Sequence, residues 1–566
     1  MMCRLFTKSR IAKKLPGLFS TSRRASSSTS PPTDWNSHSE FFDYTNARFV
    51  CNEKYEMEMR HVSFDMNELA KLAAKSVGAA KCVNVEKLSE GMFSKPFLFT
   101  MEDGSQVVGK VPNPNAGLPH FTTASEVATM DFVRNVLGTP VPKVLAWSSK
   151  ANESPVGAEF IIMEMAPGVQ LSTVWGEMGL EARFKIIKTI GGIQNEWAST
   201  SFPQYGSLYY ASDLDHPRPC ILTKRDGSQV EEPRFAVGPS MGREQFDDGR
   251  IAVQFDRGPW DTVEQCKRAV GLREIACIKA MTTLPHSPLG LYGPGTYTRC
   301  RSKKLGAAQN YLQIFKYLLP TDPSLSASFL WHDDLHVENI FVNPEAPWEI
   351  SSIIDWQSTE LLPLMDHARQ PFFLDYDGPP PDGLEEPQMP ANFSEMSPDE
   401  QAAAKVLHSL RSLSALYKLL MYRDTRNFYK AMEFRETVSF KMLIYPRKLL
   451  TDGEALYQKC IQALEEEWTS LPGVQAAGNP PFPVRFSTDE VTTIERDVDD
   501  TERGMGLMQK LELSLGDLRP EHGMVRHDQY DDVKCLLKEH KAAMMQHLAF
   551  SDEDRRAWDN SWPFGN

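Results

Sequence analysis

The stretch that decides the fold is "FLWHDDLHVENIFVNPEAPWEISSIIDWQS", residues 329–358. His332, Asp334 and Asn339 have the H-x-D-x-x-x-x-N spacing of a kinase catalytic loop. Two β-type runs, "NIFV" and "ISSIID", flank a turn, so a hairpin would return Asp355 to the point where Asp334 and Asn339 converge. The alternative is a loop of solvated and helix-capping acids.

This set of residue types suits phosphoryl transfer. The reaction needs a carboxylate that orients the attacking hydroxyl and accepts its proton, together with ligands that hold Mg²⁺ against the nucleotide phosphates. Because Mg²⁺ prefers oxygen ligands, an Asn amide and an Asp carboxylate are suitable. A single H-x-D-x-x-x-x-N match is weak, but the match followed by a β-run and "IIDW" is far more specific.

The pattern "HDDLHVENIFV" followed by "IIDWQS" resembles the aminoglycoside phosphotransferase family, the antibiotic-kinase and choline-kinase branch of the protein-kinase-like fold. The segments "NARFVCNEKYEMEMRHVSF" and "WHDDLH" are most similar to a fungal mitochondrial branch of it. The resemblance spans about residues 40–550. It implies an α+β, bilobal protein-kinase-like fold, with a small antiparallel-sheet N-lobe carrying one helix and a larger, mainly helical C-lobe with a C-terminal helical extension.

The resemblance also implies roles for the residues of the motif. Asp334 is expected to be the catalytic base, and Asn339 and Asp355 are expected to be the Mg²⁺ ligands. His332 and His336 are expected to support the loop through hydrogen bonds. The chain departs from the family where Asp333 replaces the usual Gly after the first His, which puts the local geometry in question.

The ATP site is expected in the N-terminal half. Residues 88–95, "LSEGMFSK", lie between two β-runs where a phosphate-covering loop belongs, so Gly91 and Ser94 are candidate phosphate contacts. The alternative is an ordinary hairpin turn. Lys110, in "VVGK", resembles the kinase strand Lys that binds nucleotide phosphates. The alternative for Lys110 is an edge-strand side chain exposed to water.

Three further residues complete the predicted nucleotide site. Glu126 lies on the apolar stripe of a predicted helix and is expected to pair with Lys110. Alternatively, Glu126 serves only as the capping-box partner of Thr123. Glu164 and Met165, in "IIMEMAPG", fit the connector between the lobes, whose backbone bonds the adenine in related kinases, although the strand before them is more often simply core.

Periodicity and turn residues predict the following organisation. Residues 34–166 form the N-lobe, with a helix over "DMNELAKLAAKSVGA" and a hairpin around "EDG". Residues 167–390 form the C-lobe, with an insertion at 201–260 and the catalytic loop at 331–357. Residues 391–566 form its helical C-terminal part. Asp366, in "LLPLMDHARQP", is expected to be structural.

Charge and composition narrow the class of protein. The net charge of −14 argues against a nucleic-acid partner, the nine Cys form no CxxC pair, and no run of about 18 apolar residues predicts a membrane span. Residues 1–33 are basic, Ser-rich and free of acids, which is typical of a mitochondrial transit peptide; a disordered basic tail is the alternative. Basic residues in this segment are Arg4, Lys8, Arg10, Lys13, Lys14, Arg23 and Arg24.

The resulting hypothesis is an ATP- and Mg²⁺-dependent phosphotransferase that acts on a hydroxyl of an unidentified small molecule in mitochondria. The alternative is a catalytically weak or inactive ATP-binding pseudokinase or scaffold of the same fold. A protein substrate is disfavoured, because "LLPLMDHARQP" follows Asp355 without a clear APE-type activation segment. The identity of the acceptor is not encoded in any motif.

Overall fold

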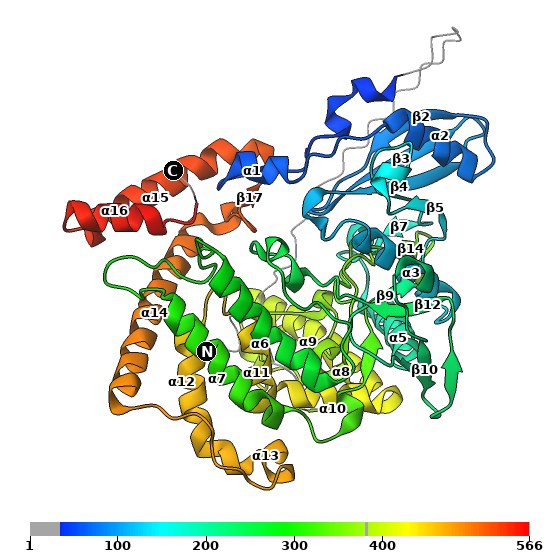
Figure 1. The fold of residues 1–566 in the computed structure, drawn as a ribbon. Coiled ribbons are helices and arrows are strands. Elements are labelled where there is room, and N and C mark those ends of the chain that lie inside the picture. The colour runs from blue at the N-terminus through cyan, green and yellow to red at the C-terminus, as the bar shows by residue number, and fades with distance from the viewer. Residues whose placement is uncertain (1–33, 380–382, 565–566) are drawn as a thin grey trace.

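The computed structural model describes residues 34–379 and 383–564, which form an α+β fold of two lobes (Figure 1). The small lobe is built on a five-stranded antiparallel sheet with the order β2-β3-β4-β6-β5. Its strands are β2 (Cys82–Lys87), β3 (Ser94–Met101), β4 (Gln106–Pro112), β5 (Val144–Ser148) and β6 (Phe160–Glu164). The predicted hairpin around Glu102-Asp103-Gly104 joins β3 to β4.

The two faces of this sheet have different partners. Phe97, Phe99 and Ile162 pack against helix α2 (Met66–Ser76), whose N-cap is Asp65. Ile161 and Met163, which alternate with them on β6, contact helix α3 (Phe121–Asn135) and the core of the large lobe. Because successive strand residues point to opposite faces, the sheet has a back face under α2 and a front face toward the large lobe.

Helix α3 begins without a capping box. The capping-box interpretation of Thr123 and Glu126 is wrong, because the helix starts at Phe121 with His120 as its N-cap and both residues lie inside it. His120 caps through no side-chain hydrogen bond and has φ of 68°. The Glu126 carboxylate therefore does not cap the N-terminal end of the helix.

The catalytic stretch folds as the predicted hairpin. Strand β14 (Ile340–Asn343) pairs antiparallel with β15 (Ala346–Ile353) and, on its other edge, with β7 (Val169–Gln170), which follows the connector. Strand β13 (Ser328–Leu330) precedes the loop and pairs with β16 (Leu361–Pro363) beyond it. These strands fix both ends of the loop that contains Asp334.

The large lobe is mainly helical. The helices are α4 (Leu171–Val174), α5 (Leu180–Trp197), α6 (Val263–Ala280), α7 (Arg301–Leu318), α8 (Leu364–His367), α9 (Pro398–Asp424), α10 (Arg426–Arg435), α11 (Val438–Ile444), α12 (Glu454–Glu467) and α13 (Pro472–Ala476). The hydrophobic core of this lobe joins the catalytic hairpin to α5 and α9, and a second core lies between α7, α11 and α12. Helices α6 and α7 lie between the insertion and the catalytic stretch.

The insertion at 201–260 contains short strands. β9 (Ser207–Tyr210) pairs with β12 (Phe235–Gly238), while β8 (Thr200–Ser201), β10 (Ile221–Lys224) and β11 (Gln229–Glu231) form a second small sheet. Strand β9 packs against α3 through residues such as Phe121 and Tyr209.

Residues 48–58 meet the C-terminal part of the described chain. Strand β1 (Arg48–Phe49) pairs with β17 (Met524–Val525), and helix α1 (Glu53–Glu58) lies beside the C-terminal helices (Figure 1). These helices are α14 (Thr488–Leu515), α15 (Tyr530–Leu548) and α16 (Asp552–Ser561). Val50 belongs to their hydrophobic core.

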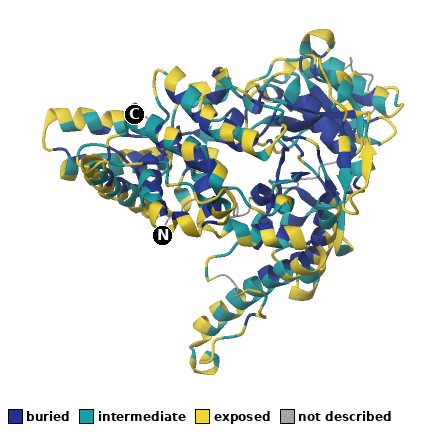
Figure 2. Ribbon diagram, turned by 60° about the horizontal axis from the view of Figure 1, so that its bottom comes forward, coloured by how far each residue is buried: buried dark blue, intermediate teal, exposed yellow. Residues whose placement is uncertain are grey.

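Burial follows this architecture, with buried residues on the strands and exposed residues on the outer sides of the peripheral helices (Figure 2). Within residues 34–379 and 383–564, no helix is both long and apolar enough to span a bilayer. The proposed transit peptide, residues 1–33, lies outside the described residues. The predicted domain boundaries remain predictions.

Candidate active site

Lys110 lies between two carboxylates, one from each lobe. Its Nζ atom is 2.6 Å from Glu126 Oε1 on α3 and 2.8 Å from Asp355 Oδ1 at the end of the catalytic hairpin. Burial of Lys110 favours its neutral form, but the two carboxylates outweigh that effect and raise its pKa, so Lys110 is a cation. The predicted pairing of Lys110 with Glu126 is present, and Asp355 joins the pair.

Strand pairing explains why Lys110 faces the cleft. Lys110 pairs with Pro96 of β3 and with Ile161 of β6, and directly opposite residues in antiparallel strands share a face. Ile161 belongs to the front-face core, so Lys110 also points to the front. The alternative of a water-exposed edge Lys is excluded, because β4 is an inner strand and Lys110 is only 8% exposed.

The catalytic loop is closed by hydrogen bonds between its two halves. Asn339 Nδ2 donates to the Asp334 carbonyl at 3.0 Å, and the Ile354 amide donates to the Asn339 carbonyl at 2.9 Å. His332 Nε2 lies 2.9 Å from the Ile354 carbonyl, and burial lowers the pKa of His332, so its neutral ring donates there. The loop thereby brings Asp334, Asn339 and Asp355 to one place.

The backbone at Asp355 is constrained as well. Its φ is 64°, in the left-handed region that non-glycine residues rarely adopt. Such a conformation persists only where the surroundings impose it, and here the bonds made by the neighbouring Ile354 do so. Partial burial opposes ionisation of Asp355, but the Lys110 ammonium outweighs it and lowers the pKa of Asp355.

His336 lies between two carboxylates. Its Nδ1 is 2.8 Å from Glu338 Oε2 and its Nε2 is 3.4 Å from Asp334 Oδ2. Burial lowers the pKa of His336, but the bonds to Asp334 and Glu338 dominate and raise it to about 10. The Asp334 side chain is otherwise open to the cleft, with 64% of it exposed.

Aromatic side chains hold the loop from both ends. Trp331, which precedes His332, stacks on Phe428 at 4.7 Å between ring centroids. Trp356, which follows Asp355, meets the His332 ring edge-on at 4.6 Å, and both Trp rings pack against Trp197. Large buried aromatic groups leave little room for movement, so the polar residues between them are held rigidly.

Asp333, which replaces the usual Gly of the family, has hydrogen-bond partners in the large lobe. Asp333 Oδ1 lies 3.1 Å from Nδ1 of His367, and Arg369 donates to the Asp333 carbonyl at 2.5 Å. Burial would raise the pKa of Asp333, but His367 and Arg369 lower it to about 2. Nearby, Asp366 accepts two bonds from the buried Lys267 of α6, at 2.6 and 2.5 Å, which agrees with a structural role.

The remaining predicted nucleotide residues lie in the small lobe, at opposite ends of its central strands. Ser94 opens β3 opposite Pro112, two positions beyond Lys110 on β4, and Gly91 lies in the loop before it. Glu164 ends β6 and its Oε2 accepts from the Lys143 amide at 2.9 Å, while the Met165 side chain is 45% exposed. The contacts of these residues with a nucleotide remain predictions.

The donor set is compatible with Mg²⁺. Asn339 donates from its amide nitrogen to the Asp334 carbonyl, which leaves its side-chain oxygen for a cation. In the described parts of the chain, no three His, Cys, Asp or Glu side chains are grouped to hold a metal ion by themselves. This is consistent with Mg²⁺, which is commonly held by one or two protein oxygens together with phosphates and water.

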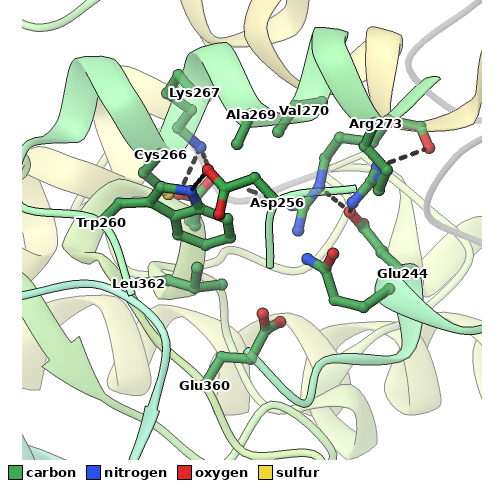
Figure 3. Close-up of a pocket in the computed structure, with 13 residues that line it drawn as sticks. Glu244, Asp256, Trp260, Cys266, Lys267, Ala269, Val270, Arg273, Glu360 and Leu362 are labelled. Carbon is green, nitrogen blue, oxygen red and sulfur yellow. Dashed lines mark hydrogen bonds and ion pairs between the residues drawn. The ribbon is translucent and has the colours of Figure 1, made fainter. Parts of the chain in front are cut away.

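A polar cavity lies behind the catalytic loop, between α6 and β16 (Figure 3). Its volume is about 30 Å³, which suffices for a few water molecules but not for a metabolite. Its charged lining residues are Glu244, Asp256, Lys267, Arg273, Glu360, Asp366 and Arg447. The cavity is therefore a buried cluster of charged side chains that is too small to hold a metabolite.

Sequence reasoning did not find the partners of Asp333, nor the burial of Glu90 directly before the predicted phosphate contact Gly91. His367 and Arg369 lie in "DHAR", directly after Asp366, and this dense polar run was the only available signal. Glu90 is flanked by Lys87 and Lys95, but alternating charges in a loop ordinarily indicate a solvated turn.

Comparison with known proteins agrees with this geometry. Residues 294–365 match the phosphotransferase enzyme family (APH). A subtelomeric hrmA-associated cluster protein of Aspergillus fumigatus is 33% identical over 364 residues, covering 59% of this chain and 69% of that protein. The chain belongs to the phosphotransferase enzyme family, and its two lobes have the protein-kinase-like arrangement.

More distant relatives extend over more of the chain. The mitochondrial altered inheritance of mitochondria protein 9 of Yarrowia lipolytica is 23% identical over 484 residues, covering 80% of this chain and 79% of that protein. Among solved structures, the ADP-bound aminoglycoside phosphotransferase APH(2'')-Ib covers 71% of this chain and 97% of its own, at 11% identity and a TM-score of 0.35. A score at that level adds nothing to the assignment.

Proposed function

We propose that this protein transfers a phosphoryl group from Mg·ATP to a hydroxyl of a small molecule, and that it does so in mitochondria. The observation that supports the reaction best is the position of Lys110, which lies within 2.8 Å of both Glu126 and Asp355. A buried cation held by carboxylates from both lobes requires a closely specified arrangement. That arrangement suits a site that holds nucleotide phosphates.

The chain's own residues divide the work of binding. Lys110 binds phosphate oxygens, and Glu126 fixes the direction of its side chain. Gly91 and Ser94 approach the phosphates from the small lobe, and the backbone at Glu164 and Met165 binds the adenine. Asn339 and Asp355 would hold Mg²⁺, and bound Mg·ATP would supply the transferable group and neutralise charge on it.

Asp334 acts as the base. Its exposed carboxylate accepts the proton of the acceptor hydroxyl, while the bond from Asn339 to its carbonyl fixes the backbone at that point. The protonated His336, whose Nε2 lies 3.4 Å from Asp334 Oδ2, places a positive charge beside this carboxylate. The rate enhancement would come mostly from positioning and charge stabilisation.

The scaffold alternative drew support from Asp333 in place of Gly. In the structure the Asp333 side chain turns to His367 and leaves the loop hydrogen bonds of His332 and Asn339 in place. That observation favours an active enzyme over a scaffold. Membership of a phosphotransferase family points the same way.

The mitochondrial address rests on the basic, acid-free residues 1–33 and on relatives whose names place them in mitochondria. Imaging a fusion of residues 1–40 to a fluorescent reporter tests it. A signal that overlaps a mitochondrial marker supports the address, and a cytosolic signal contradicts it.

Nucleotide binding and turnover test the reaction. The purified chain without residues 1–33 is expected to gain thermal stability with Mg·ATP, because a ligand that binds only the folded state stabilises it. Release of ADP is then followed across fractionated pools of hydroxylated metabolites. If Mg·ATP neither binds nor turns over, the proposal fails; if it binds but no pool gives turnover, the scaffold alternative gains.

A further inference from the structure

The loop that joins β2 to β3 contains a buried carboxylate. Glu90 has 1% of its side chain exposed, yet it lies one residue before Gly91, a proposed phosphate contact. Its oxygens accept from the Thr45 amide at 2.5 Å and the Thr45 hydroxyl at 3.0 Å. They also pair with Lys95 at 3.0 Å and with Lys87 at 2.8 Å.

These partners lie on the back of the sheet. Lys95 precedes Pro96, which shares the front face with Lys110, and side chains alternate along a strand. Lys95 is completely buried on the same face as Phe97 and Phe99, under the helix α2 side. Glu90 therefore pulls the loop toward the back face, whereas Ser94 points to the front, where Lys110 lies.

Thr45 belongs to a segment that connects the loop to the C-terminal helices. We name residues 40–50 the strap. At one end, the strap carbonyls of Glu40 and Asp43 accept from Lys87, and that of Asp43 also accepts from Lys95. At the other end, its strand β1 pairs with β17, next to α15 and α16 (Figure 1).

Further contacts bind the strap to the C-terminal helices. The Val50 amide donates to the Gly523 carbonyl at 2.9 Å, and His527 Nε2 lies 3.1 Å from the Thr45 carbonyl. Arg48 pairs with Glu53 at 2.8 Å and lies over the Tyr530 ring at 3.5 Å. Thr45 is thus held by Glu90 on one side and by the C-terminal segment on the other.

We propose that Glu90 is a positioning residue for the nucleotide phosphates, and that the strap and the C-terminal helices form the support against which it holds the 88–94 loop. The proposal rests on the proposed function, since it assigns a role within the same ATP site. A loop held in its binding conformation pays less entropy when the ligand arrives. The effect falls on the phosphates, which the loop covers, and not on the adenosine moiety, which the connector binds.

The test compares two affinities in each variant, for Mg·ATP and for adenosine, by competition against a fluorescent nucleotide. Glu90→Gln keeps the size of the side chain but removes the charge that pairs with Lys87 and Lys95. We expect it to weaken Mg·ATP binding about tenfold while adenosine affinity changes less than about twofold. Glu90→Asp, which keeps the charge on a shorter side chain, is expected to recover part of the loss.

Glu454→Gln provides the matched control. Glu454 is another buried carboxylate, 2.8 Å from Lys304 and 3.0 Å from the Tyr297 hydroxyl, but it lies on α12 in the large lobe. Glu454→Gln removes a buried, paired charge as Glu90→Gln does, so both variants should lose stability, but Glu454 has no contact with the 88–94 loop. The ratio of the two affinities is expected to stay at the wild-type value.

Arg48→Ala tests the support without disturbing the buried charges. It removes the contact of the strap with Glu53 and Tyr530 at a partly exposed position, so the chain is expected to fold. We expect Mg·ATP affinity to fall about threefold, with adenosine affinity unchanged. If Glu90→Gln fails to fold, the more conservative Glu90→Asp tests the role of Glu90 and Arg48→Ala tests its support.

Each outcome is decisive. If the wild type binds no Mg·ATP, the proposed function fails. If the wild type binds but both Glu90→Gln and Arg48→Ala keep the wild-type ratio, Glu90 is merely structural and the inference is overturned while the function stands. If only Glu90→Gln changes the ratio, Glu90 positions the loop but the C-terminal helices do not contribute.

Discussion

Asp333 Oδ1 and His367 Nδ1 lie 3.1 Å apart, although the two residues are 34 positions apart in the sequence. The second nitrogen of His367, Nε2, is 3.1 Å from the Phe329 carbonyl. The His367 ring therefore links the first residue of the catalytic stretch to Asp333. His367 is fully buried and Asp333 is 39% exposed on its side chain. The residue that departs from the family pattern therefore supports the loop from behind, beside the residue proposed as base.

Asp333→Asn is expected to reduce stability more than nucleotide binding. It removes the charge paired with His367 and Arg369, which should lower the free energy of unfolding by about 1–3 kcal/mol. Because the carboxylate points away from the cleft, Mg·ATP affinity should change less than about threefold. Thermal unfolding and nucleotide titration measure the two effects. A large loss of affinity with unchanged stability would place Asp333 in the binding site.

Lys110→Met is expected to abolish Mg·ATP binding and to destabilise the fold. It leaves Glu126 and Asp355 without their shared cation, and removing one partner of a buried ion pair costs about 3–5 kcal/mol. Lys110→Arg keeps the charge and serves as the control for stability. The account is wrong if Lys110→Met binds Mg·ATP as the wild type does.

Glu360 predicts a pH dependence of stability. It is buried and accepts a hydrogen bond from Ser240, yet burial dominates and raises its pKa from 4.5 to about 7. Between these values the folded state retains a proton that the unfolded chain has released. Stability therefore falls as the pH rises from 4.5 to 7, and the full cost is present above pH 7.

Glu360→Gln removes this cost while keeping an oxygen that can accept from Ser240. The variant should be more stable than the wild type by up to about 3 kcal/mol at pH 8, and the difference should vanish toward pH 4.5. Thermal denaturation of both proteins between pH 4.5 and pH 8 measures it. A difference that is the same at every pH would show that ionisation of Glu360 is not its cause.

Gly168 follows the connector at a point where its backbone closely approaches strand β14. Its φ is 94°, and a Cβ atom there would lie 2.1 Å from the Val342 carbonyl oxygen on β14. Gly168→Ala should therefore cost more than the roughly 1–2 kcal/mol typical of a left-handed conformation alone. Gly138→Ala is the matched control, because Gly138 has φ of 70° and open space around it. Equal melting temperatures for the two variants would contradict this interpretation.

The sequence motif was sufficient to predict the catalytic hairpin and its polar residues. The H-x-D-x-x-x-x-N spacing is local, and the β-runs after it place Asp355 by simple strand geometry. Strand alternation and helical periodicity were likewise sufficient to predict the pairing of Lys110 with Glu126. Local patterns do not mark where α3 begins, because its N-cap, His120, makes no side-chain capping bond.

Long-range pairings could not be predicted from such patterns. Glu53 and Tyr530 are 477 residues apart, and strands β1 and β17 have two residues each, too few for any periodicity. The same limit applies to Glu90, whose burial depends on Thr45 arriving from a distant segment. Their partners are chosen by tertiary packing, which overrides local preference.

Asp334→Asn is the most direct test of phosphoryl transfer. The Asp334 side chain is largely exposed, so the substitution should leave the melting temperature and the Mg·ATP affinity close to those of the wild type. With a metabolite pool that supports ADP release by the wild type, loss of the base should reduce the rate by about 10²–10⁴-fold. Turnover by Asp334→Asn at the wild-type rate would contradict the assignment of Asp334 as the catalytic base.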